Sequence, residues 1–269
     1  PYIWVNYLND IEHMKDLKES QAYIDAIEGR TGIECFDYWI KDLGRDGYLH
    51  NHTRMWFASI WIHTLRLPWQ LGADIFLKHL IDGDPASNTL SWRWVAGLHT
   101  KGKSYLAYPD NIKRFTNGKF YPHKQLATHV KSAKEEDKPL PKQLNLESKL
   151  RPGKKGFLVH ESDLSPNFLN GYDMILIQGN PLKSTSRSSL VQGFISDALK
   201  EYQKKCTENQ KCDVSLINLE DSKMIKRLMD EKSLSSLSSN YPAIGAVNDQ
   251  IKKLRNESII VDYQYQKWD

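Results

Sequence analysis

The chain has 269 residues, of which 40% are hydrophobic and 26% are charged, and its formal net charge is +4. This length allows one or two domains with buried cores. No apolar run approaches the ~18 residues that a membrane helix needs. The start PYIWVNYLND lacks the basic and then apolar order of a secretory signal. We therefore expect a cytoplasmic protein that does not bind membranes.

The cysteines and histidines do not form a metal-binding or disulfide pattern. The three cysteines, which make neither a CxxC pair nor an even framework, are Cys35, Cys206 and Cys212. Free thiols in a reducing compartment are expected. His50, His52 and His63 lack HExxH spacing, and residues at i and i+2 do not share a helix face. We predict no metal site.

The first part of the chain has helical periodicity. Residues 32–44, GIECFDYWIKDLG, predict an amphipathic helix that ends at Gly44. Residues 50–69, HNHTRMWFASIWIHTLRLPW, are apolar nearly all round from Met55 to Leu67 and predict a buried helix ended before Pro68.

Two further helices are expected next along the chain. Residues 70–83, QLGADIFLKHLIDG, predict a short amphipathic helix. Asp84 before Pro85 then predicts the start of another helix.

Positive charge is concentrated in the middle of the chain. Residues 101–160 carry 14 basic and 5 acidic side chains. Such an excess favours polyanion binding, because each cation that neutralises a phosphate releases a counterion. Within it, residues 131–155 are more typical of a solvated linker. The candidates for nucleic-acid contact are the interleaved cations and aromatic residues Lys101, Lys103, Tyr105, Tyr108, Lys113, Arg114 and Phe115.

The second part of the chain has a different period. Short β-branched runs alternate with helical stretches at residues 189–206 and 224–234; the runs are GFLV, DMILIQG, CDVSLINL and SIIVDYQY. This order predicts a parallel α/β layer, without a GxGxxG or GxxxxGK[ST] phosphate loop. The fold class is thus mostly α in the first half, followed by a smaller α/β domain. We expect a helical domain over 1–130, a linker over 131–153 and an α/β domain over 154–269.

Residues 80–94, LIDGDPASNTLSWRW, hold the most unusual cluster of side chains. Asp82 and Asp84 are two residues apart at a helix end, so they would point apart, which disfavours a hydrolytic pair. Together with Asn88, a cation and several indoles, the set suits a large flat redox cofactor. Packing alone is the alternative that these residues leave open.

Residues 31–97 resemble the helical FAD-binding domain of the DNA photolyase and cryptochrome family. The pieces that carry the resemblance, in the family's order, are TG at 31–32, GYLHNHTRM, LRLPW, DGDPASN and WRW. The resemblance implies FAD as cofactor and light-driven splitting of pyrimidine dimers in damaged DNA, which is a lyase activity. It leaves an antenna chromophore unassigned.

The resemblance also implies roles for single residues. The flavin contacts would be Asn51, Arg54, Asp82, Gly83, Asp84 and Asn88, with Arg54 paired to Asp82 and Asn88 beside the flavin N5, as in repair enzymes. Trp92 and then Trp69 would pass electrons to the ring, with Tyr23 or Trp4 as a third member. The residues that receive a flipped dimer would be Asn51, His52, Met55 and Trp94.

Some residues depart from the family's pattern. His52 replaces an arginine that touches DNA, which makes phosphate binding there dependent on pH. Leu90 and Ser91 replace two glycines and are expected to narrow the pocket. The family's phosphate-gripping segment would lie before residue 1, so we expect a chain cut from a longer protein, with weak FAD binding by residues 1–269 alone. A blue-light receptor without repair activity and a module that has lost FAD remain the alternatives.

Overall fold

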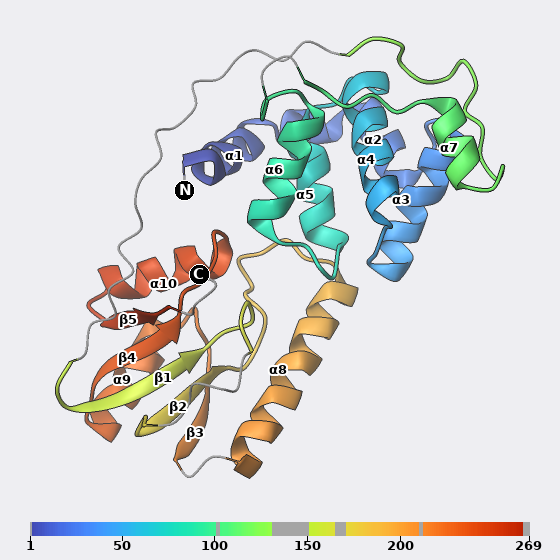
Figure 1. Ribbon diagram of the computed structural model, residues 1–269. Helices are drawn as coiled ribbons and strands as arrows, with labels where there is room; N and C mark the ends of the chain where they lie inside the picture. The colour runs from blue at the N-terminus through green and yellow to red at the C-terminus, as the bar shows by residue number, and fades with distance from the viewer. Residues whose placement is uncertain (1, 101–102, 131–150, 165–170, 210–211, 266–269) are drawn as a thin grey trace. The chain divides into compact units, whose positions relative to one another are not determined.

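The computed structural model describes residues 2–100, 103–130, 151–164, 171–209 and 212–265. The chain divides into two compact units, residues 1–140 and residues 141–269 (Figure 1). The predicted linker, residues 131–153, falls mostly outside the described residues, so its conformation stays a prediction. The predicted fold class is confirmed, since a helical part precedes a small parallel sheet with helices.

The helical unit is built from short helices. They are α1 (Tyr2–His13), η1 (Asp16–Glu19), α2 (Gln21–Glu28), α3 (Glu34–Asp46), α4 (Asn51–Ser59), the π-turn η2 (Ile60–Thr64), α5 (Trp69–His79), α6 (Pro85–Val95) and α7 (Pro109–Phe115). Asp84 caps α6, and its Oδ1 accepts a hydrogen bond from the Ser87 N–H at 2.7 Å, as the Asp-Pro signal predicts.

Two predicted helix ends were wrong. Helix α3 passes through Gly44 and ends at Gly47, whose φ of 65° lies in the left-handed region that glycine adopts readily. The buried helix predicted to reach Leu67 ends at Thr64, because Arg66 adopts a positive φ of 59°. In both places the helix ends at or just before a residue in the left-handed conformation, Gly47 or Arg66, and not at the predicted Gly44 or Pro68.

The core of the helical unit is aromatic. The buried Trp92 ring meets Phe57, Trp61 and Phe76 edge-on, with centroids 6.4, 6.4 and 5.0 Å away. Gly72 on α5 lets this indole approach, since a Cβ there would lie 2.3 Å from the Trp92 ring. The face of α6 that carries Trp92 is therefore held against α4 and α5.

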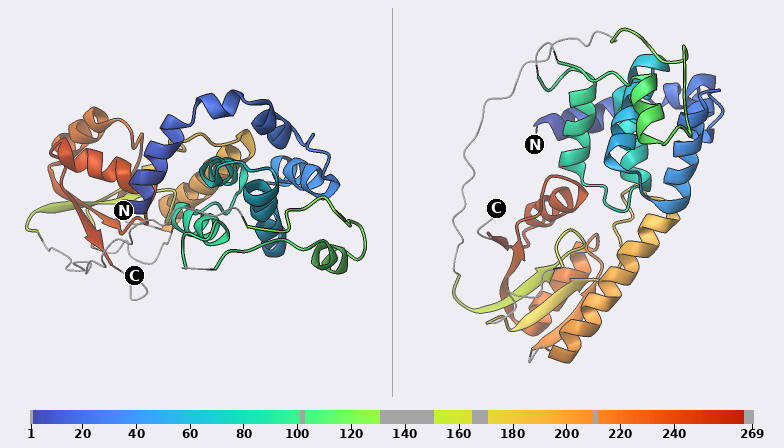
Figure 2. Two further views of the ribbon diagram at one scale, coloured as in Figure 1. Left: turned by 90° about the horizontal axis from the view of Figure 1, so that it is seen from above. Right: turned by 45° about the vertical axis from the view of Figure 1, so that its right-hand side comes forward.

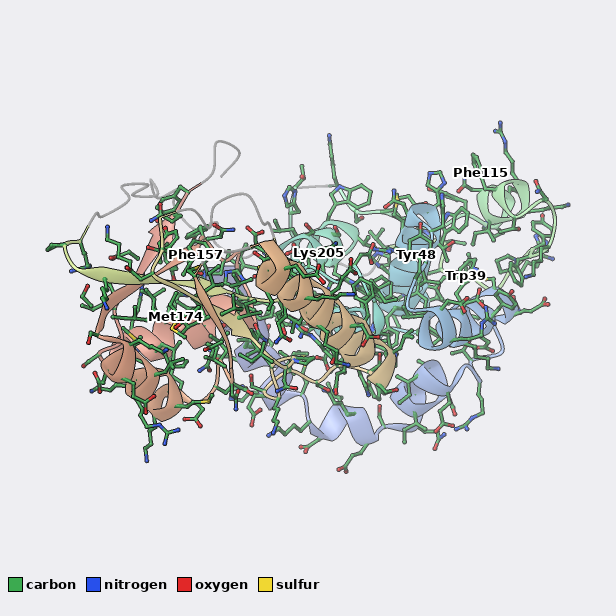
Figure 3. All side chains as sticks on the ribbon, turned by 90° about the horizontal axis from the view of Figure 1, so that it is seen from below. Trp39, Tyr48, Phe115, Phe157, Met174 and Lys205 are labelled. Atoms are coloured by element: carbon green, nitrogen blue, oxygen red, sulfur yellow. The ribbon has the colours of Figure 1, made fainter. Side chains whose placement is uncertain are left out.

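The α/β unit has a five-stranded parallel sheet in the order β3-β2-β1-β4-β5. The strands are β1 (Lys154–Val159), β2 (Met174–Gln178), β3 (Asp213–Ile217), β4 (Leu234–Asn240) and β5 (Val261–Gln264), and the helices are α8 (Ser189–Asn209), α9 (Ser222–Lys232) and α10 (Ala246–Asn256). Helix α8 covers one face of the sheet, and α9 and α10 cover the other (Figure 2). Phe157 and Met174, labelled in Figure 3, belong to the cores on these two opposite faces.

Strand β4 and helix α10 have no counterpart in the sequence prediction. Strand β4, LSSLSSN, is half serine, yet it pairs with β1 and β5 inside the sheet and buries Ser238 and Ser239. The predicted helix over 224–234 ends at Lys232, which releases Leu234 into this strand.

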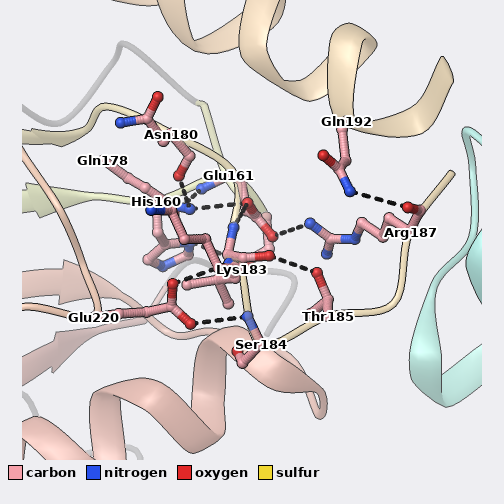
Figure 4. Close-up of polar contacts among 12 residues, drawn as sticks. His160, Glu161, Gln178, Asn180, Lys183, Ser184, Thr185, Arg187, Gln192 and Glu220 are labelled. Atoms are coloured by element: carbon pink, nitrogen blue, oxygen red, sulfur yellow. Dashed lines mark hydrogen bonds and ion pairs between the residues drawn. The ribbon is translucent and has the colours of Figure 1, made fainter. Parts of the chain in front are cut away.

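Polar side chains join the loops that follow β1 and β2 (Figure 4). Glu161 pairs with the Arg187 guanidinium at 2.6 Å and accepts hydrogen bonds from Gln178 Nε2 at 2.8 Å and from the Leu182 N–H at 3.3 Å. Glu220 accepts from the N–H groups of Lys183 and Ser184. The partners of Glu161 are Gln178, the last residue of β2, and Leu182 and Arg187 in the segment between β2 and α8. The network therefore holds the segments after β1 and β2 together.

The described residues form neither a membrane-spanning helix nor a cluster of metal-ligating side chains. No helix among them combines the length and the apolar character needed to cross a membrane. Within the same residues, no group of three or more His, Cys, Asp or Glu side chains is placed to hold a metal ion.

Candidate functional site

The helical unit contains a pocket of about 550 Å³ bounded by α4, α5, α6 and the turn before α6. This volume lies in the range of small-molecule sites. It is lined by nine of the predicted site residues: Asn51, Arg54, Met55, Asp82, Gly83, Asp84, Asn88, Trp92 and Trp94. Helix α6 supplies the last three, which places the predicted cofactor and substrate residues around one space.

Arg54 and Asp82 form a two-pronged ion pair on one side of the pocket. The Arg54 Nη2 lies 2.9 Å from both carboxylate oxygens of Asp82, and the Arg54 Nε donates to the Leu49 carbonyl oxygen at 2.7 Å. The Arg54 and Asp82 side chains are 24% and 56% exposed. The guanidinium is thus oriented by two partners, and its charge is neutralised before any ligand binds.

The other carboxylate of the DGD turn has a different partner. The Asp84 Oδ1 is bound to the Ser87 N–H and caps helix α6. Gly83 between the two aspartates is closely packed, since a Cβ there would lie 3.0 Å from the Leu80 carbonyl oxygen. Asp82 therefore fixes the Arg54 guanidinium, whereas Asp84 fixes the start of helix α6.

Asn88 and Trp92 supply the buried polar atoms beside the pocket. The Asn88 Nδ2 donates to the Ala73 carbonyl oxygen at 2.9 Å, which leaves its amide oxygen for a ligand. The buried Trp92 Nε1 has no hydrogen-bond partner among the described residues. A buried N–H without an acceptor costs free energy, so a ligand that accepts from this indole would be favoured.

Trp94, a half-buried residue of α6, also lines the pocket. Its ring stacks on Tyr105, with centroids 5.6 Å apart and an interplanar angle of 26°. Burial raises the pKa of the Tyr105 phenol, so the ring that stacks on the Trp94 indole carries no charge at neutral pH. A rigid, half-buried indole of this kind can stack on a planar ligand.

Two predicted site residues lie outside this pocket. The His52 ring packs 5.4 Å from Phe115 and 5.9 Å from Trp56. Trp69 lines a second pocket of about 310 Å³, which also includes Arg93. His52 is not among the residues that line the first pocket, although Asn51, the residue before it in sequence, is.

The Trp69 ring belongs to a stack of three aromatic rings. Trp69 stacks on Tyr7 at 5.9 Å, and Tyr7 stacks on Trp4 at 5.4 Å. Tyr23 instead meets Trp61 edge-on at 5.9 Å. Burial raises the pKa of Tyr7 above its ordinary range and that of Tyr23 to about 12. Both phenols therefore keep their protons at neutral pH.

The sequence prediction missed several residues that line the first pocket. The polar ones are Ser87 and His99, and the apolar ones are Ala58, Phe76, Leu80 and Val95. His99 follows α6 in an irregular segment and carried no motif, whereas the apolar residues looked like ordinary helix core. Leu90 and Ser91, noted in the sequence as replacements for glycines, also line the pocket.

Comparison with known proteins gives a consistent likeness. Residues 3–129 match the family described as the FAD binding domain of DNA photolyase. The chain is 44% identical over 72 residues to a deoxyribodipyrimidine photo-lyase of Streptomyces griseus, which covers 27% of this chain and 16% of the relative. It is 42% identical over 94 residues to the enzyme of that name from Agrobacterium fabrum, covering 35% and 19%.

A third relative of the same name, from Escherichia coli, is 37% identical over 78 residues, covering 29% of this chain and 16% of the relative. In these three matches the chain spans less than a fifth of the relative's length. The matched stretch includes the part of the chain that builds the first pocket.

The pocket fits the ring of a flavin better than its phosphates. Phe76, Leu80 and Trp92 offer an apolar wall, and the Asn88 amide offers a polar contact. Among the described lining residues Arg54 is the one permanent cation, and Asp82 already neutralises it. A diphosphate would need cations or free N–H groups that this lining does not supply.

Proposed function

Residues 3–129 belong to the FAD-binding domain family of DNA photolyases, with FAD as the cofactor of that domain, and from this premise we propose light-dependent repair of pyrimidine dimers in DNA. The observation that carries the proposal is the first pocket itself. It brings the DGD turn, Asn88 and Trp92 together with Asn51, Met55 and Trp94 around one space. A cofactor ring and a substrate base would therefore share this space.

The cofactor side would be formed by six residues: Asn51, Arg54, Asp82, Gly83, Asp84 and Asn88. Reduced FAD bound there would supply the electron that light drives into the dimer. The Arg54 guanidinium, fixed by Asp82 and the Leu49 carbonyl, would orient the polar edge of the ring. The Asn88 amide oxygen, set by the Nδ2 bond to Ala73, would accept a hydrogen bond from a ring N–H.

The substrate side would be formed by four residues: Asn51, His52, Met55 and Trp94. Trp94 would stack on the flipped dimer, with Tyr105 behind the indole to keep it upright. Met55 would fill the space beside the dimer with a polarizable thioether. Extruding a damaged base pair costs a few kcal/mol of unstacking, which this stacking offsets.

Trp92 and Trp69 would supply the electron that reduces the cofactor before repair, and the electron lent to the dimer would return to the cofactor once the ring has split. Trp92 lines the pocket, and its three edge-on aromatic contacts hold it in place. Trp69 begins a stack that continues through Tyr7 to Trp4. We assign the third position to Trp4, because the Tyr7 phenol has no acceptor among the described residues to take its proton on oxidation.

A second candidate is a helical module that has lost the repair chemistry. Leu90 and Ser91 line the pocket where family members carry glycines, which reduces the space for a dimer. A blue-light receptor that keeps FAD but does not repair DNA would share this feature. The enzyme is favoured by Trp94 and Met55, since a receptor needs no indole to stack on a dimer.

The first experiment combines an absorption spectrum with a repair assay. The purified chain is incubated with FAD and photoreduced in blue light with a thiol, and then mixed with a dimer-containing oligonucleotide. We expect flavin bands that bleach in light and loss of dimers in light only. Because weak binding is expected of residues 1–269, binding is measured by titration with FAD. No binding at any FAD concentration would refute the proposal, and bound flavin without dimer loss would favour the receptor.

Trp94→Ala separates the two sides of the pocket. This substitution should leave the flavin spectrum unchanged and weaken binding of dimer DNA by roughly tenfold, the usual scale for one base stacked on an aromatic ring. The matched control is Trp39→Phe in the aromatic core, away from the pocket lining. Equal loss of dimer affinity in both variants would point to a general loss of structure.

A further inference from the structure

A cationic and aromatic surface lies mainly on helix α7 and the turn that follows it. We name it the α7 surface, and it consists of His52, Lys113, Arg114, Phe115, Lys119 and Tyr121. Phe115 is 53% exposed, although a large apolar ring is usually buried. Figure 3 shows Phe115 on α7 within the helical unit. Contact between the His52 and Phe115 rings, at 5.4 Å, joins α7 to the start of α4, which also carries the pocket residue Asn51.

The helix below the α7 surface is firmly anchored. Ile112 is completely buried, and the Asn111 Oδ1 accepts a hydrogen bond from the Trp56 Nε1 at 3.0 Å. The turn after the helix is closed by Thr116, whose Oγ1 accepts from the Phe120 N–H at 3.3 Å. Phe115 is therefore presented to solvent from a fixed position, so its exposure does not come from a loose chain end.

Cations lie over the rings of this surface. The Lys113 ammonium is 4.5 Å from the centre of the Tyr121 ring, and the Arg114 guanidinium is 5.4 Å from that of Phe115. Lys119 lies 3.6 Å from the ring centre of the exposed Tyr38. Residues 103–124 carry five Lys or Arg residues against one acid, Asp110. Positive charge and exposed aromatic rings thus occur together.

This combination suits a nucleic acid whose bases are unpaired. Lysine and arginine attract phosphates in single and double strands alike, but only an unpaired base offers a free face to an aromatic ring. When a base stacks on Tyr121, the Lys113 ammonium that lies over this ring can move away and bind a phosphate of the same strand. A surface that served duplex DNA alone would need the cations and would gain nothing from exposed Phe115.

Resting on the proposed function, we propose that the α7 surface binds single-stranded DNA, with unpaired bases next to the flipped dimer stacking on Phe115 and Tyr121. His52, which contacts Phe115, directly follows in sequence Asn51, a residue that lines the pocket. Nucleotides that lose their neighbours when the dimer leaves the helix would be held there. The chain should therefore prefer single strands to duplexes of equal length.

The test uses undamaged DNA in the dark, so it does not depend on repair. Fluorescence anisotropy measures the affinity of the full chain for a labelled 16-nucleotide single strand and for a duplex of the same length. Phe115→Ala should weaken single-strand binding roughly tenfold and duplex binding about twofold or less. The matched control is Phe194→Ala on α8, a ring that is also 53% exposed, and this variant should bind as the parent chain does.

Salt dependence separates stacking from charge. The logarithm of the binding constant for the single strand falls as the logarithm of the salt concentration rises. The double variant Lys113→Ala, Arg114→Ala should make this slope less steep by about 1.4, at ~0.7 for each phosphate contact on a single strand. Phe115→Ala should leave this slope unchanged. Lys226→Ala, an exposed lysine on α9, is the control for a general change of charge.

Three results would overturn the inference: no difference between Phe115→Ala and Phe194→Ala, equal losses for single strand and duplex, or preference of the parent chain for duplex. If the parent chain repairs dimers but Phe115→Ala binds single strands as well as the parent chain does, this inference is rejected and the proposed function stands. Single-strand binding by a protein that retains no flavin would reject the proposed repair function and leave the α7 surface standing.

Discussion

The two units of the chain each contain an arginine–carboxylate pair, and the pairs differ in burial. Arg54 and Asp82 in the helical unit are 24% and 56% exposed, whereas Arg187 and Glu161 in the α/β unit are 20% and 3% exposed. An exposed pair contributes little to stability, but a buried pair is costly to break, because one charge is left without a partner. The first pair is thus free to serve a ligand, and the second holds the fold.

The hydrophobic cores of the two units also differ: the core of the helical unit is aromatic and adjoins a pocket, and that of the α/β unit is largely aliphatic. In the helical unit large rings such as Trp61 and Trp92 meet edge to face beside a pocket of about 550 Å³. In the α/β unit aliphatic residues such as Leu158 and Leu176 pack between the sheet and α9 and α10. Polar chemistry therefore reaches the interior of the helical unit through the pocket, while in the α/β unit it is gathered in the loops after the strands.

The largest expected effect comes from breaking the buried pair. Glu161→Ala should lower the free energy of unfolding of the α/β unit by about 3–5 kcal/mol, since Arg187, Gln178 and the Leu182 N–H lose their acceptor. Asp82→Ala should cost the helical unit about 1 kcal/mol or less. Hydrogen exchange of peptides from β1, β2 and α4 measures both units in one sample. Equal costs would abolish the distinction between a structural pair and a ligand-serving pair.

A smaller effect of opposite sign in the two units is expected from one glycine substitution in each. Gly72→Ala in α5 places a methyl group 2.3 Å from the Trp92 ring, whose other neighbours are buried aromatics, so it should destabilise the helical unit by about 1–3 kcal/mol. Gly193→Ala in α8 meets nothing within 4 Å and should stabilise the α/β unit by about 0.5–1 kcal/mol.

Urea unfolding read by tryptophan fluorescence follows Gly72→Ala, because seven of the eight tryptophans lie in residues 4–94. Exchange of α8 amides follows Gly193→Ala. The flavin spectrum of Gly72→Ala should also weaken, since Trp92 can relieve the clash only by moving toward the pocket. A Gly72→Ala variant as stable as the parent chain would show that α5 and α6 are less tightly packed than the ring contacts indicate.

Much of the site could be predicted because its residues follow one helix face. Asp84, Asn88 and Trp92 are spaced by four residues, so the cap, the amide and the indole of α6 lie above one another. The partner of Asp82 was also foreseen, because the resemblance named Arg54 and the ion pair is present. Trp69 is one residue whose place local spacing could not give, since its neighbours Tyr7 and Trp4 come from α1.

The missed elements depend on contacts between distant segments. Strand β4 has serines where a strand is expected to carry β-branched residues, and it is a strand because β1 and β5 supply hydrogen-bonding partners on both sides. Helix α3 continues past Gly44 because that position is open to solvent, so a glycine there costs little and does not turn the chain. His99 reaches the pocket from an irregular segment whose path no local pattern encodes.

An effect that needs no substitution is a dependence of the α/β unit on acid. Burial lowers the pKa of His160 below its ordinary value of 6.5, against smaller opposing effects of the Asn240 carbonyl, Asp163 and Glu161. Below pH 6.5 the unfolded chain therefore binds a proton that the folded unit resists. Stability contributed by neutral His160 is complete above pH 6.5 and falls at lower pH by at most ~1.4 kcal/mol per pH unit.

His160→Gln keeps a side-chain N–H that can donate to the Asn240 carbonyl oxygen, as the His160 Nε2 is placed to do at 3.3 Å, but it cannot titrate. Exchange of β1 and β4 amides should therefore rise from pH 6.5 to pH 5 in the parent chain, after correction for the intrinsic rate, and stay flat in the variant. The same slope in both proteins would assign the acid sensitivity to other groups. A flat parent profile would mean that water reaches His160 when it is protonated, and that the α/β core is less closed than its buried residues indicate.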